Sequence, residues 1–575
     1  MTVPHQVSGR YRALAETKFD LVVIGGGIIG CGIARDAALR GLRVALFEKE
    51  DFCSGTSSRS TRLIHGGLRY LEQFDIGLVR QDLRERERLL ATAPHRVTPL
   101  RFLVPLYNRS AVYRARLRAG MILYDLLSYD KSLPNHRFLS RNEAVELEPG
   151  LAQEGLQGAA SYYDAQCAFV ERLCLDNVTD AVENGAQVYN YTSVTGLHRE
   201  GNHVAGLSVR DTLTGETTEV IAEQVVNASG PWLDQLTGSL TGQSGSLLRL
   251  TKGVHFAAPR AVNHALVLFS NKDGRLFFVI PWLGLSLVGT TDTDYTADMD
   301  AVWAIGDDVR YLQAGVEPAL PCADWKQIYY TSAGVRALVR SDHPNARESE
   351  VSRKHLLRAH TSEEGWEGLF SVLGGKLTAY RGIAEETVAA VVRQLYRSRM
   401  APQQTSGGLY DSGPARVCTT GTRPLPGGDF AGGDFSGGNI NGMEALRTEV
   451  RRHASVLNLT ETQADNLTTL YGTRAARVLQ LVRARPELGQ PIAPPYPDIR
   501  AEITYAVQHE WVQTVSDFMV RRSLLGFTPD QGRSATRAVA HEMGHLLCWD
   551  AERIANEQDS YRAYIELTQR FRRED

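Results

Sequence analysis

Apolar and polar positions divide the first fifty residues into a strand, a helix and a second strand. Residues 19–24 are almost entirely apolar, which is typical of a buried strand, and residues 28–40 repeat apolar side chains at helical spacing. A second apolar run covers residues 43–48. Together these segments predict a βαβ unit, the building block of a parallel sheet.

The remaining pattern predicts an α/β body followed by a helical domain. Apolar spacing predicts helices at 77–90, 168–184, 383–397 and, with short breaks, throughout 443–575. The helix at 77–90 is highly charged, so we expect it on the surface. A two-stranded hairpin is expected at 275–290, around Trp282–Gly284. Residues 402–442 are rich in Gly, Pro, Ser and Thr, which indicates a linker or long loop.

Composition narrows the class of protein. Hydrophobic residues make up 43% and charged residues 22% of 575 positions, which is typical of a soluble globular chain. The formal net charge is −3, so there is no global bias toward nucleic acid, and we expect no such partner. Seven cysteines form no CxxC pair, which argues against a disulfide framework and favours a reducing cytoplasm. No apolar stretch reaches ~18 residues, so we expect no membrane-spanning helix.

A glycine-rich turn joins the first strand to the first helix. Gly25, Gly27 and Gly30 fit the G-x-G-x-x-G pattern, and Glu48 ends the next strand. In such a unit the glycines allow a tight turn, close approach of a pyrophosphate and helix–strand packing, while the helix N-terminus attracts the anion. Glu48 would accept hydrogen bonds from ribose hydroxyls and repel a 2′-phosphate. The pattern therefore predicts FAD or NAD in preference to NADP.

A loop rich in hydroxyl groups follows the second strand. Thr56, Ser57 and Ser58 lie between Cys53 and Ser60, and their hydroxyls and backbone amides could bind phosphate as part of an anion nest. A plain polar loop is the alternative.

The chain then resembles a known family. Residues 60–72 (STRLIHGGLRYLE) closely resemble the signature of FAD-dependent glycerol-3-phosphate dehydrogenases. Other segments match that family in order: Asn227–Trp232, Thr251–His255, Val279–Trp282, Gly289–Asp292, Ser332–Arg336, Gly374–Arg381, Pro424–Gly428 and His509–Trp511. So many matches in order make coincidence implausible.

The resemblance implies an α/β fold with three parts. These are a Rossmann-like FAD-binding domain of the D-amino-acid-oxidase type, an α+β substrate domain and a helical C-terminal cap domain. The expected division is 18–100, 165–245 and 345–400 for FAD binding, 101–164 and 246–344 for the substrate and membrane-facing domain, 401–442 for a Gly/Pro-rich linker, and 443–575 for the helical domain.

The resemblance also implies the chemistry and the site. The reaction would oxidise sn-glycerol 3-phosphate to dihydroxyacetone phosphate, with hydride passing to noncovalently bound FAD. The expected cofactor-binding residues are Gly25, Gly27, Gly30, Glu48, Thr56, Ser57, Ser58, His65, Gly67, Gly230, Gly375, Lys376, Leu377 and Thr378.

Substrate binding requires cations for a phosphate and an acceptor for the hydroxyl proton. Arg69, Arg336 and Lys376 stand in motifs of the family's substrate site, and their charges suit a phosphate dianion. Lys376 could instead stabilise the reduced flavin. His255 is the first candidate for the proton acceptor, and Arg336 could stabilise an alkoxide. Tyr70 and Thr291 could hydrogen-bond the substrate.

Residues 109–126 alternate basic and large apolar side chains. An amphipathic segment lying on anionic lipid would have this pattern, as would a solvent-capped helix packed on the body. The resemblance favours the membrane, because dehydrogenases of this family bind membranes peripherally and reduce quinone. We therefore expect a cytoplasmic protein peripherally associated with the cytoplasmic membrane and a quinone acceptor. Formation of a homodimer stays open.

Other functions remain as alternatives. An oxidase using O₂, or an amine or amino-acid oxidase, could have the same fold, since fold alone does not fix the substrate. His541 and His545 form an HExxH motif, as in zinc peptidases, with Glu542 as the base. However, Gly544 is unfavourable within a helix and no further ligand motif follows. We therefore expect no metal site.

Overall fold

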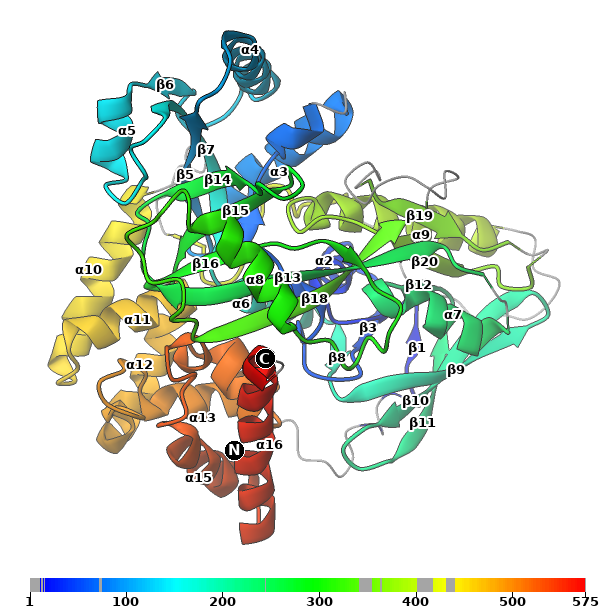
Figure 1. Ribbon diagram of the computed structural model, residues 1–575. Helices are drawn as coiled ribbons and strands as arrows, with labels where there is room; N and C mark the ends of the chain where they lie inside the picture. Colours follow the sequence, from blue (N-terminus) through cyan, green and yellow to red (C-terminus); the bar gives the residue numbers. More distant parts are fainter. Residues whose placement is uncertain are drawn as a thin grey trace.

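The computed structural model describes Tyr11, Leu14 and residues 16–71, 75–242, 245–340, 354–361, 364–400, 417–430 and 440–573. In Figure 1 the amino-terminal two thirds contain the sheets, and the last third forms a group of helices at the lower left. Within the described residues, none of the helices is both long and apolar enough to cross a membrane.

The predicted βαβ unit lies at the centre of a six-stranded sheet. It consists of β2 (Leu21–Ile24), α2 (Ile28–Leu39) and β3 (Val44–Phe47). The strand order is β19 (Leu356–Ala359), β20 (Leu369–Leu373), β12 (Val225–Asn227), β2, β3 and β8 (Gln187–Tyr189). All neighbouring pairs are parallel except β19 with β20. The central strands β2 and β3 are apolar throughout because both faces of the sheet are covered.

Helices cover one face of this sheet and a second sheet covers the other. On the helical face, α2 packs against α6 (Val170–Glu183) and α9 (Tyr380–Met400). On the opposite face lies a sheet in the order β1 (Lys18–Phe19), β11 (Thr217–Ala222), β10 (His203–Asp211) and β9 (Thr192–Glu200). Val22 of β2 shares its hydrophobic core with Val209 and Val220 of this second sheet. The layers therefore bury the central sheet and leave the ends of its strands for a ligand.

A ten-stranded sheet forms the neighbouring layer. The main path runs β17 (Thr293–Asp294), β13 (Leu248–Pro259), β16 (Leu285–Gly289), β15 (Leu276–Trp282), β14 (Ala265–Phe269), β5 (Val97–Tyr107), β7 (Leu156–Cys167) and β4 (Leu63–Ile64). In addition, β18 (Tyr330–Val339) pairs with β13, and β6 (Arg137–Leu139) pairs with β7. The predicted hairpin is β15–β16, and its turn residues Leu283 and Gly284 both have positive φ.

Two segments of the expected division pack differently from the expectation. The strand β4 and the start of β5 lie within 18–100, yet they belong to the ten-stranded sheet, because β7 supplies their hydrogen-bonding partner. The described part of the expected linker, 417–430, packs on the body. Leu425 is fully buried there, and its N–H donates to the carbonyl oxygen of Thr92 at 2.8 Å. Residues 401–416 and 431–439 lie outside the described residues.

The charged helix α3 (Ile76–Thr92) is not confined to the surface. Asp82, Glu85 and Arg86 are buried, contrary to the prediction from composition. Each has an ionic partner: Asp82 pairs with Lys376, Glu85 with Arg381, and Arg86 with Asp164. Burial of these charges is tolerated because they are paired, which charge content along the sequence cannot indicate.

The helical C-terminal region begins at α10 (Ile440–Val456). It continues through α11 (Glu461–Tyr471), α12 (Ala475–Ala484), α13 (Arg500–His509), α15 (Thr536–Leu547) and α16 (Ala551–Thr568). Arg521 and Arg522 join this region to the loop after β3 through ion pairs with Asp51. The contact fixes the helical region against the domain that carries the glycine-rich turn.

Candidate active site

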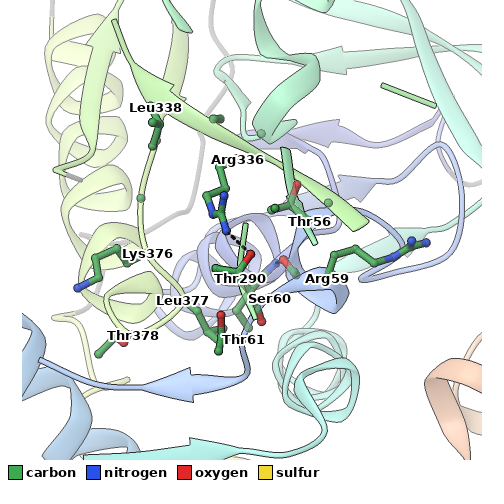
Figure 2. A pocket seen from close by; sticks show the side chains of 18 of the residues that line it. Thr56, Arg59, Ser60, Thr61, Thr290, Arg336, Leu338, Lys376, Leu377 and Thr378 are labelled. Atoms are coloured by element: carbon green, nitrogen blue, oxygen red, sulfur yellow. Dashed lines mark hydrogen bonds between the residues drawn. The ribbon is translucent and has the colours of Figure 1, made fainter. Parts of the chain in front are cut away.

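A cavity of about 1590 Å³ lies where the six-stranded and ten-stranded sheets meet. Its lining runs from Gly25 and Glu48, at the carboxyl ends of β2 and β3, to His255 and Arg336 on the ten-stranded sheet. Sites for drug-sized ligands typically measure roughly 300–1,000 Å³. This cavity therefore has room for a dinucleotide cofactor together with a small substrate. Figure 2 shows side chains from β18 of the ten-stranded sheet together with residues of the loops that follow β3, β16 and β20.

The glycine-rich turn has the geometry that the fingerprint requires. Gly25 has φ of +105°, and a Cβ at Gly30 would lie 3.1 Å from the carbonyl carbon of Gly25 and still closer to its oxygen. Gly27 precedes α2 and lines the cavity. The Ile28 N–H donates to Ser57 Oγ at 3.0 Å, so the loop after β3 lies against the first turn of α2. The helix N-terminus thus faces the cavity as an anion site.

Glu48 lies beside the glycine-rich turn. Its Oε2 accepts a hydrogen bond from the Gly26 N–H at 2.6 Å, and Oε1 accepts one from the Glu50 N–H at 3.0 Å. Burial raises the pKa of Glu48 to about 7. A carboxyl group in this position can accept hydrogen bonds from ribose hydroxyls, as the fingerprint predicts. The cradle therefore fits the adenosine diphosphate part of FAD.

The hydroxyl-rich loop contributes two of its three predicted residues to the cavity. Thr56 and Ser57 line it, and Thr56 Oγ1 donates to the carbonyl oxygen of Val335 at 2.6 Å. Ser58 lies outside the lining of this cavity, and its hydroxyl donates to the carbonyl oxygen of Gly55 at 2.9 Å. The loop forms a 3₁₀ turn over Thr56–Arg59, which turns the Ser58 side chain away from the cavity. We therefore drop Ser58 from the expected cofactor contacts.

The segment before α9 borders the same cavity. Gly375, with φ of +106°, Leu377 and Thr378 line it, and Thr378 Oγ1 accepts a hydrogen bond from the His65 N–H at 3.1 Å. This hydrogen bond links two of the family motifs, residues 60–72 and Gly374–Arg381. The other predicted cofactor residues in the lining are His65, Gly67 and Gly230.

Arg336 projects from β18 and is held by neighbouring oxygen atoms. Its Nη1 lies 3.0 Å from Asp292 Oδ1, and its Nη2 donates to Thr290 Oγ1 at 2.7 Å (Figure 2). The side chain extends over Gly253 on β13, where a Cβ would lie 2.5 Å from the guanidinium carbon. The guanidinium group is thus fixed in direction while it borders the cavity.

His255 lies on β13 in the wall of the cavity. It is 2% exposed, and its Nε2 forms a hydrogen bond of 2.9 Å with Thr61 Oγ1. Its Nδ1 is buried and has no hydrogen-bond partner among the described residues. Burial, together with the positive charges of Arg336 and Arg62, lowers the pKa of His255 to about 3. The imidazole is therefore neutral at neutral pH and has a nitrogen available to accept a proton.

Lys376 has an ionic partner that the sequence did not indicate. Its Nζ forms an ion pair with the buried Asp82 and lies 4.5 Å from the centre of the Tyr70 ring. Burial raises the pKa of Asp82 to about 6, although the ammonium group of Lys376 acts to lower it. Lys376 and Tyr70 both line the cavity. The ammonium group can therefore contact an anion there, but it also serves to balance the charge of Asp82.

Two further predicted substrate residues are placed differently from the others. Thr291 is buried outside the lining, and its Oγ1 accepts a hydrogen bond from the Val254 N–H at 3.0 Å. Thr290 lines the cavity in its place and contacts Arg336. We therefore replace Thr291 by Thr290 in the proposed site. The side chain of Arg69 lies outside the described residues.

The sequence did not single out several polar residues of the lining. These are Arg59, Ser60, Thr61, Arg116, Arg275 and Thr290. Thr61 and Thr290 stand inside motifs that were recognised, so the motifs could have indicated them. Arg116 and Arg275 reach the cavity from the helix α4 (Ala111–Leu127) and from the turn before β15, and only the tertiary structure brings these segments together.

The HExxH motif lies on α15, away from this cavity. His541 and His545 are exposed, and Glu566 on the neighbouring helix α16 forms an ion pair with Arg573. Within the described residues, no group of three His, Cys, Asp or Glu side chains is arranged to hold a metal ion. The geometry gives no support to zinc chemistry at this motif.

Comparisons with known proteins agree with the geometry. The family model of FAD dependent oxidoreductases matches residues 20–381, and that of the C-terminal domain of alpha-glycerophosphate oxidase matches residues 418–554. A glycerol-3-phosphate dehydrogenase from Synechocystis sp. is 40% identical over 96% of this chain and 97% of its own. An aerobic glycerol-3-phosphate dehydrogenase from Staphylococcus saprophyticus is 35% identical over 89% of this chain and 87% of its own.

A solved structure supports the same conclusion. The X-ray structure of the glycerol-3-phosphate dehydrogenase from Bacillus halodurans complexed with FAD matches with a TM-score of 0.78 and 28% identity, covering 99% of this chain and 98% of that one. The predicted fold class, family and FAD cofactor are thereby confirmed. With its glycine-rich cradle, its two-sheet body and its helical C-terminal region, this chain belongs to the family of FAD-dependent glycerol-3-phosphate dehydrogenases.

Proposed function

We propose that the protein oxidises sn-glycerol 3-phosphate to dihydroxyacetone phosphate and passes the electrons to a membrane quinone. One observation carries the proposal. A neutral imidazole, His255, and a fixed guanidinium, Arg336, come from adjacent strands and border the cavity that also contains the FAD cradle. Several cations line the same cavity, as an anionic substrate requires: Lys49, Arg59, Arg62, Arg116, Arg275, Arg336, Lys354 and Lys376.

The reaction removes a hydride from carbon 2 and a proton from the hydroxyl group on that carbon. Bound FAD supplies the two-electron acceptor for the hydride. His255 accepts the proton at Nε2, the nitrogen that Thr61 orients. Arg336, held by Asp292 and Thr290, stabilises the negative charge that develops on the substrate oxygen.

The phosphate group has its own proposed partners. Lys376 offers a point charge at the cavity wall, and Tyr70 packs beneath its ammonium group. Arg69 keeps its proposed role in phosphate binding from the motif alone. The remaining contacts of FAD are proposed for Gly25, Gly27, Glu48, Thr56, Ser57, His65, Gly67, Gly230, Gly375, Leu377 and Thr378, whereas Gly30, which is not in the lining, is proposed to allow α2 to pack against the glycine-rich turn.

Anaerobic reduction of the purified holoenzyme tests the substrate. Addition of sn-glycerol 3-phosphate should bleach the visible flavin absorption, whereas glycine and D-amino acids should not. Bleaching by an amino acid instead would assign the chain to the amine-oxidising alternative. A His255→Gln variant that retains FAD should be reduced far more slowly, by about 10²-fold or more.

Support for a quinone acceptor comes from the apolar end of the cavity. There α4 contributes Leu117 and Leu123, and the ten-stranded sheet contributes Val104, Val267 and Phe269. An apolar wall of this kind suits the ring and tail of a quinone. After anaerobic reduction, a short-chain quinone should reoxidise the enzyme much faster than O₂ does. The opposite order would favour an oxidase.

The outer face of α4 supports peripheral membrane binding. Val112 is 78% and Leu126 is 64% exposed, and the neighbouring Arg114, Arg116 and Arg118 are also exposed. Apolar side chains beside a basic cluster are typical of a helix that lies on anionic lipid. The protein should float with anionic vesicles, and a charge reversal of the three arginines should abolish this binding. A cytoplasmic, membrane-associated location and a homodimer stay predictions.

A further inference from the structure

A second, smaller cavity of about 40 Å³ lies on the other side of His255. Arg59, Ser60, Arg62 and His255 line both cavities. The far wall of the smaller cavity comes from the C-terminal region, with Arg521, Gln531, Tyr564 and Thr568 among its lining residues. His255 therefore separates the substrate cavity from a polar space at the interface with the C-terminal helices.

Strand register determines which edge of the imidazole faces the smaller cavity. His255 pairs with Gly289 of β16 on one side and with Ser332 of β18 on the other. The Cδ2 edge of the ring lies against Gly289, since a Cβ there would approach Cδ2 more closely than any other atom of the ring. Nδ1 is on the opposite edge and therefore faces β18, where Ser332 lines the smaller cavity.

The two ring nitrogens have different surroundings. Nε2 forms a hydrogen bond with Thr61, which lines the large cavity, whereas Nδ1 is buried and has no hydrogen-bond partner in the part of the chain that the structure describes. A buried polar atom without a partner costs about 1–3 kcal/mol, so native proteins usually supply water to such groups. A space of this size accommodates one to about three water molecules by the usual criterion. Ser332, Gln531 and Tyr564 provide polar groups around it.

We propose that the smaller cavity holds water and forms the exit route for the substrate proton, which passes through His255 into the interface with the C-terminal helices. The proposal rests on the proposed oxidation of glycerol 3-phosphate. The proton of the substrate hydroxyl binds to Nε2 while the proton on Nδ1 leaves to the cavity water. One proton crosses the ring and no electrons move with it. Exchange with water between turnovers restores the starting tautomer.

Electrostatics favour rapid release of the proton. The cations near the ring are Arg336, paired with Asp292, and Arg62, paired with Glu171. Together with burial they hold the pKa of His255 at about 3, so an imidazolium cannot persist at neutral pH. A proton accepted from the substrate must therefore move on. The C-terminal region contributes Gln531, in the turn before α15, and Tyr564, on α16, as positioning residues for that water.

Filling the smaller cavity tests the route. A Ser332→Leu variant of the holoenzyme should lose the water, because the larger side chain projects into the space beside Nδ1. Its anaerobic flavin reduction should slow by about tenfold or more, and its solvent deuterium isotope effect should rise as proton transfer becomes rate-limiting. KM should change little, since the substrate cavity is untouched. A high-resolution crystal structure should show water within hydrogen-bond distance of Nδ1 in the unaltered enzyme and none in the variant.

A second pair of variants keeps the test decisive if Ser332→Leu does not fold. Tyr564→Phe removes a hydroxyl from the cavity wall and should raise the solvent isotope effect. Tyr396→Phe is the control, because Tyr396 is 44% exposed on α9 and is not among the lining residues of either cavity. Unaltered isotope effects in both test variants, or a dry cavity in the crystal, would overturn the route. If glycerol 3-phosphate does not reduce the unaltered enzyme, the proposed function is wrong. The crystal structure would still show whether the smaller cavity holds water beside Nδ1.

Discussion

Gly289 lies directly opposite His255 across β13 and β16, and the absence of a side chain at Gly289 makes room for the imidazole ring. A Cβ at this position would lie 2.8 Å from Cγ of His255 and closer still to Cδ2. The ring therefore leans over the neighbouring strand, and this places Nε2 next to Thr61. The position of the proposed base thus depends on a glycine that takes no part in the chemistry.

A Gly289→Ala substitution should displace the imidazole. Because a shift of about 1 Å can reduce catalysis about 10²-fold, flavin reduction by glycerol 3-phosphate should slow by about that factor. FAD content should stay near that of the unaltered enzyme. Gly77→Ala on α3 is a matched control, since a Cβ there meets nothing within 4 Å. Stopped-flow spectroscopy measures the rate of flavin reduction. An unchanged rate in Gly289→Ala would show that catalysis does not depend on this position of the imidazole ring.

Removal of the Arg336 guanidinium should reduce kcat/KM by about 10²–10³-fold, because it takes away the charge that stabilises the developing alkoxide. Free guanidinium ion should restore part of the rate, since the side chain leaves a space above Gly253 that the ion fits. Steady-state kinetics of Arg336→Ala with and without guanidinium chloride make the test, and sodium chloride controls for ionic strength. A loss that guanidinium does not rescue would indicate a structural role.

Asp51 should be critical for attachment of the C-terminal helices. Arg522 Nη2 donates to Asp51 Oδ1 at 2.9 Å, and all three residues of the Asp51, Arg521 and Arg522 cluster are largely or fully buried. Burial would raise the pKa of Asp51, but the guanidinium groups of Arg522 and Arg521 hold it below its ordinary value. Asp51→Asn leaves the buried Arg522 without a charge partner, whereas Arg521 keeps Asp517, so the free energy of unfolding should fall by about 3–5 kcal/mol.

The control for that substitution is an exposed ion pair. Asp559 and Arg562 pair on the surface of α16, with 67% and 61% of their side chains exposed. Because water and salt screen such pairs, Asp559→Asn should change stability by less than about 1 kcal/mol. Denaturant unfolding of both variants compares the two environments. Equal losses of unfolding free energy in the two variants would contradict the proposal that the buried Asp51 cluster holds the C-terminal helices in place.

Binding of FAD should weaken as the pH falls through 7. The pKa of Glu48 is raised by burial to about 7, and the carboxylate form is the better acceptor for ribose hydroxyls. Below that pH the carboxyl must lose a proton to bind, so the affinity should fall by up to about tenfold per pH unit. Fluorescence titration of the apoprotein with FAD measures this, and Glu48→Gln should remove the dependence.

The same pKa has the opposite effect on the apoprotein. A carboxyl group whose pKa is higher in the folded than in the unfolded state favours folding at low pH. Its contribution therefore declines as the pH rises from 4.5, the ordinary value, to about 7. Thermal unfolding of the unaltered apoprotein and of the Glu48→Gln apoprotein, measured from about pH 5 to about pH 8, tests this expectation. The stability of the unaltered apoprotein should decline with rising pH, and the contribution of Glu48 to that decline should be missing in the variant.

Short-range patterns sufficed for the cofactor-binding unit. The apolar runs around Gly25–Gly30 predicted β2, α2 and β3 to within one or two residues, because strand, turn and helix there depend on neighbours within thirty positions. The hairpin β15–β16 was predicted for the same reason, since its turn residues are adjacent in the chain. The family motifs added FAD and the identity of His255 and Arg336 as candidates.

Contacts between distant segments decided the rest. Whether Thr290 or Thr291 borders the cavity depends on how this stretch lies beside Val254 and Arg336, and either threonine fits the motif. Lys376 meets Asp82 across 294 positions, and the charged helix α3 is buried through such pairs. The sequence by itself determined the nucleotide-binding unit and the residue types of the site, because these follow from local periodicity and motif. Only the tertiary structure decided which side chains face the cavity and which charges neutralise one another, because burial and ion pairing are set by segments far apart in the chain.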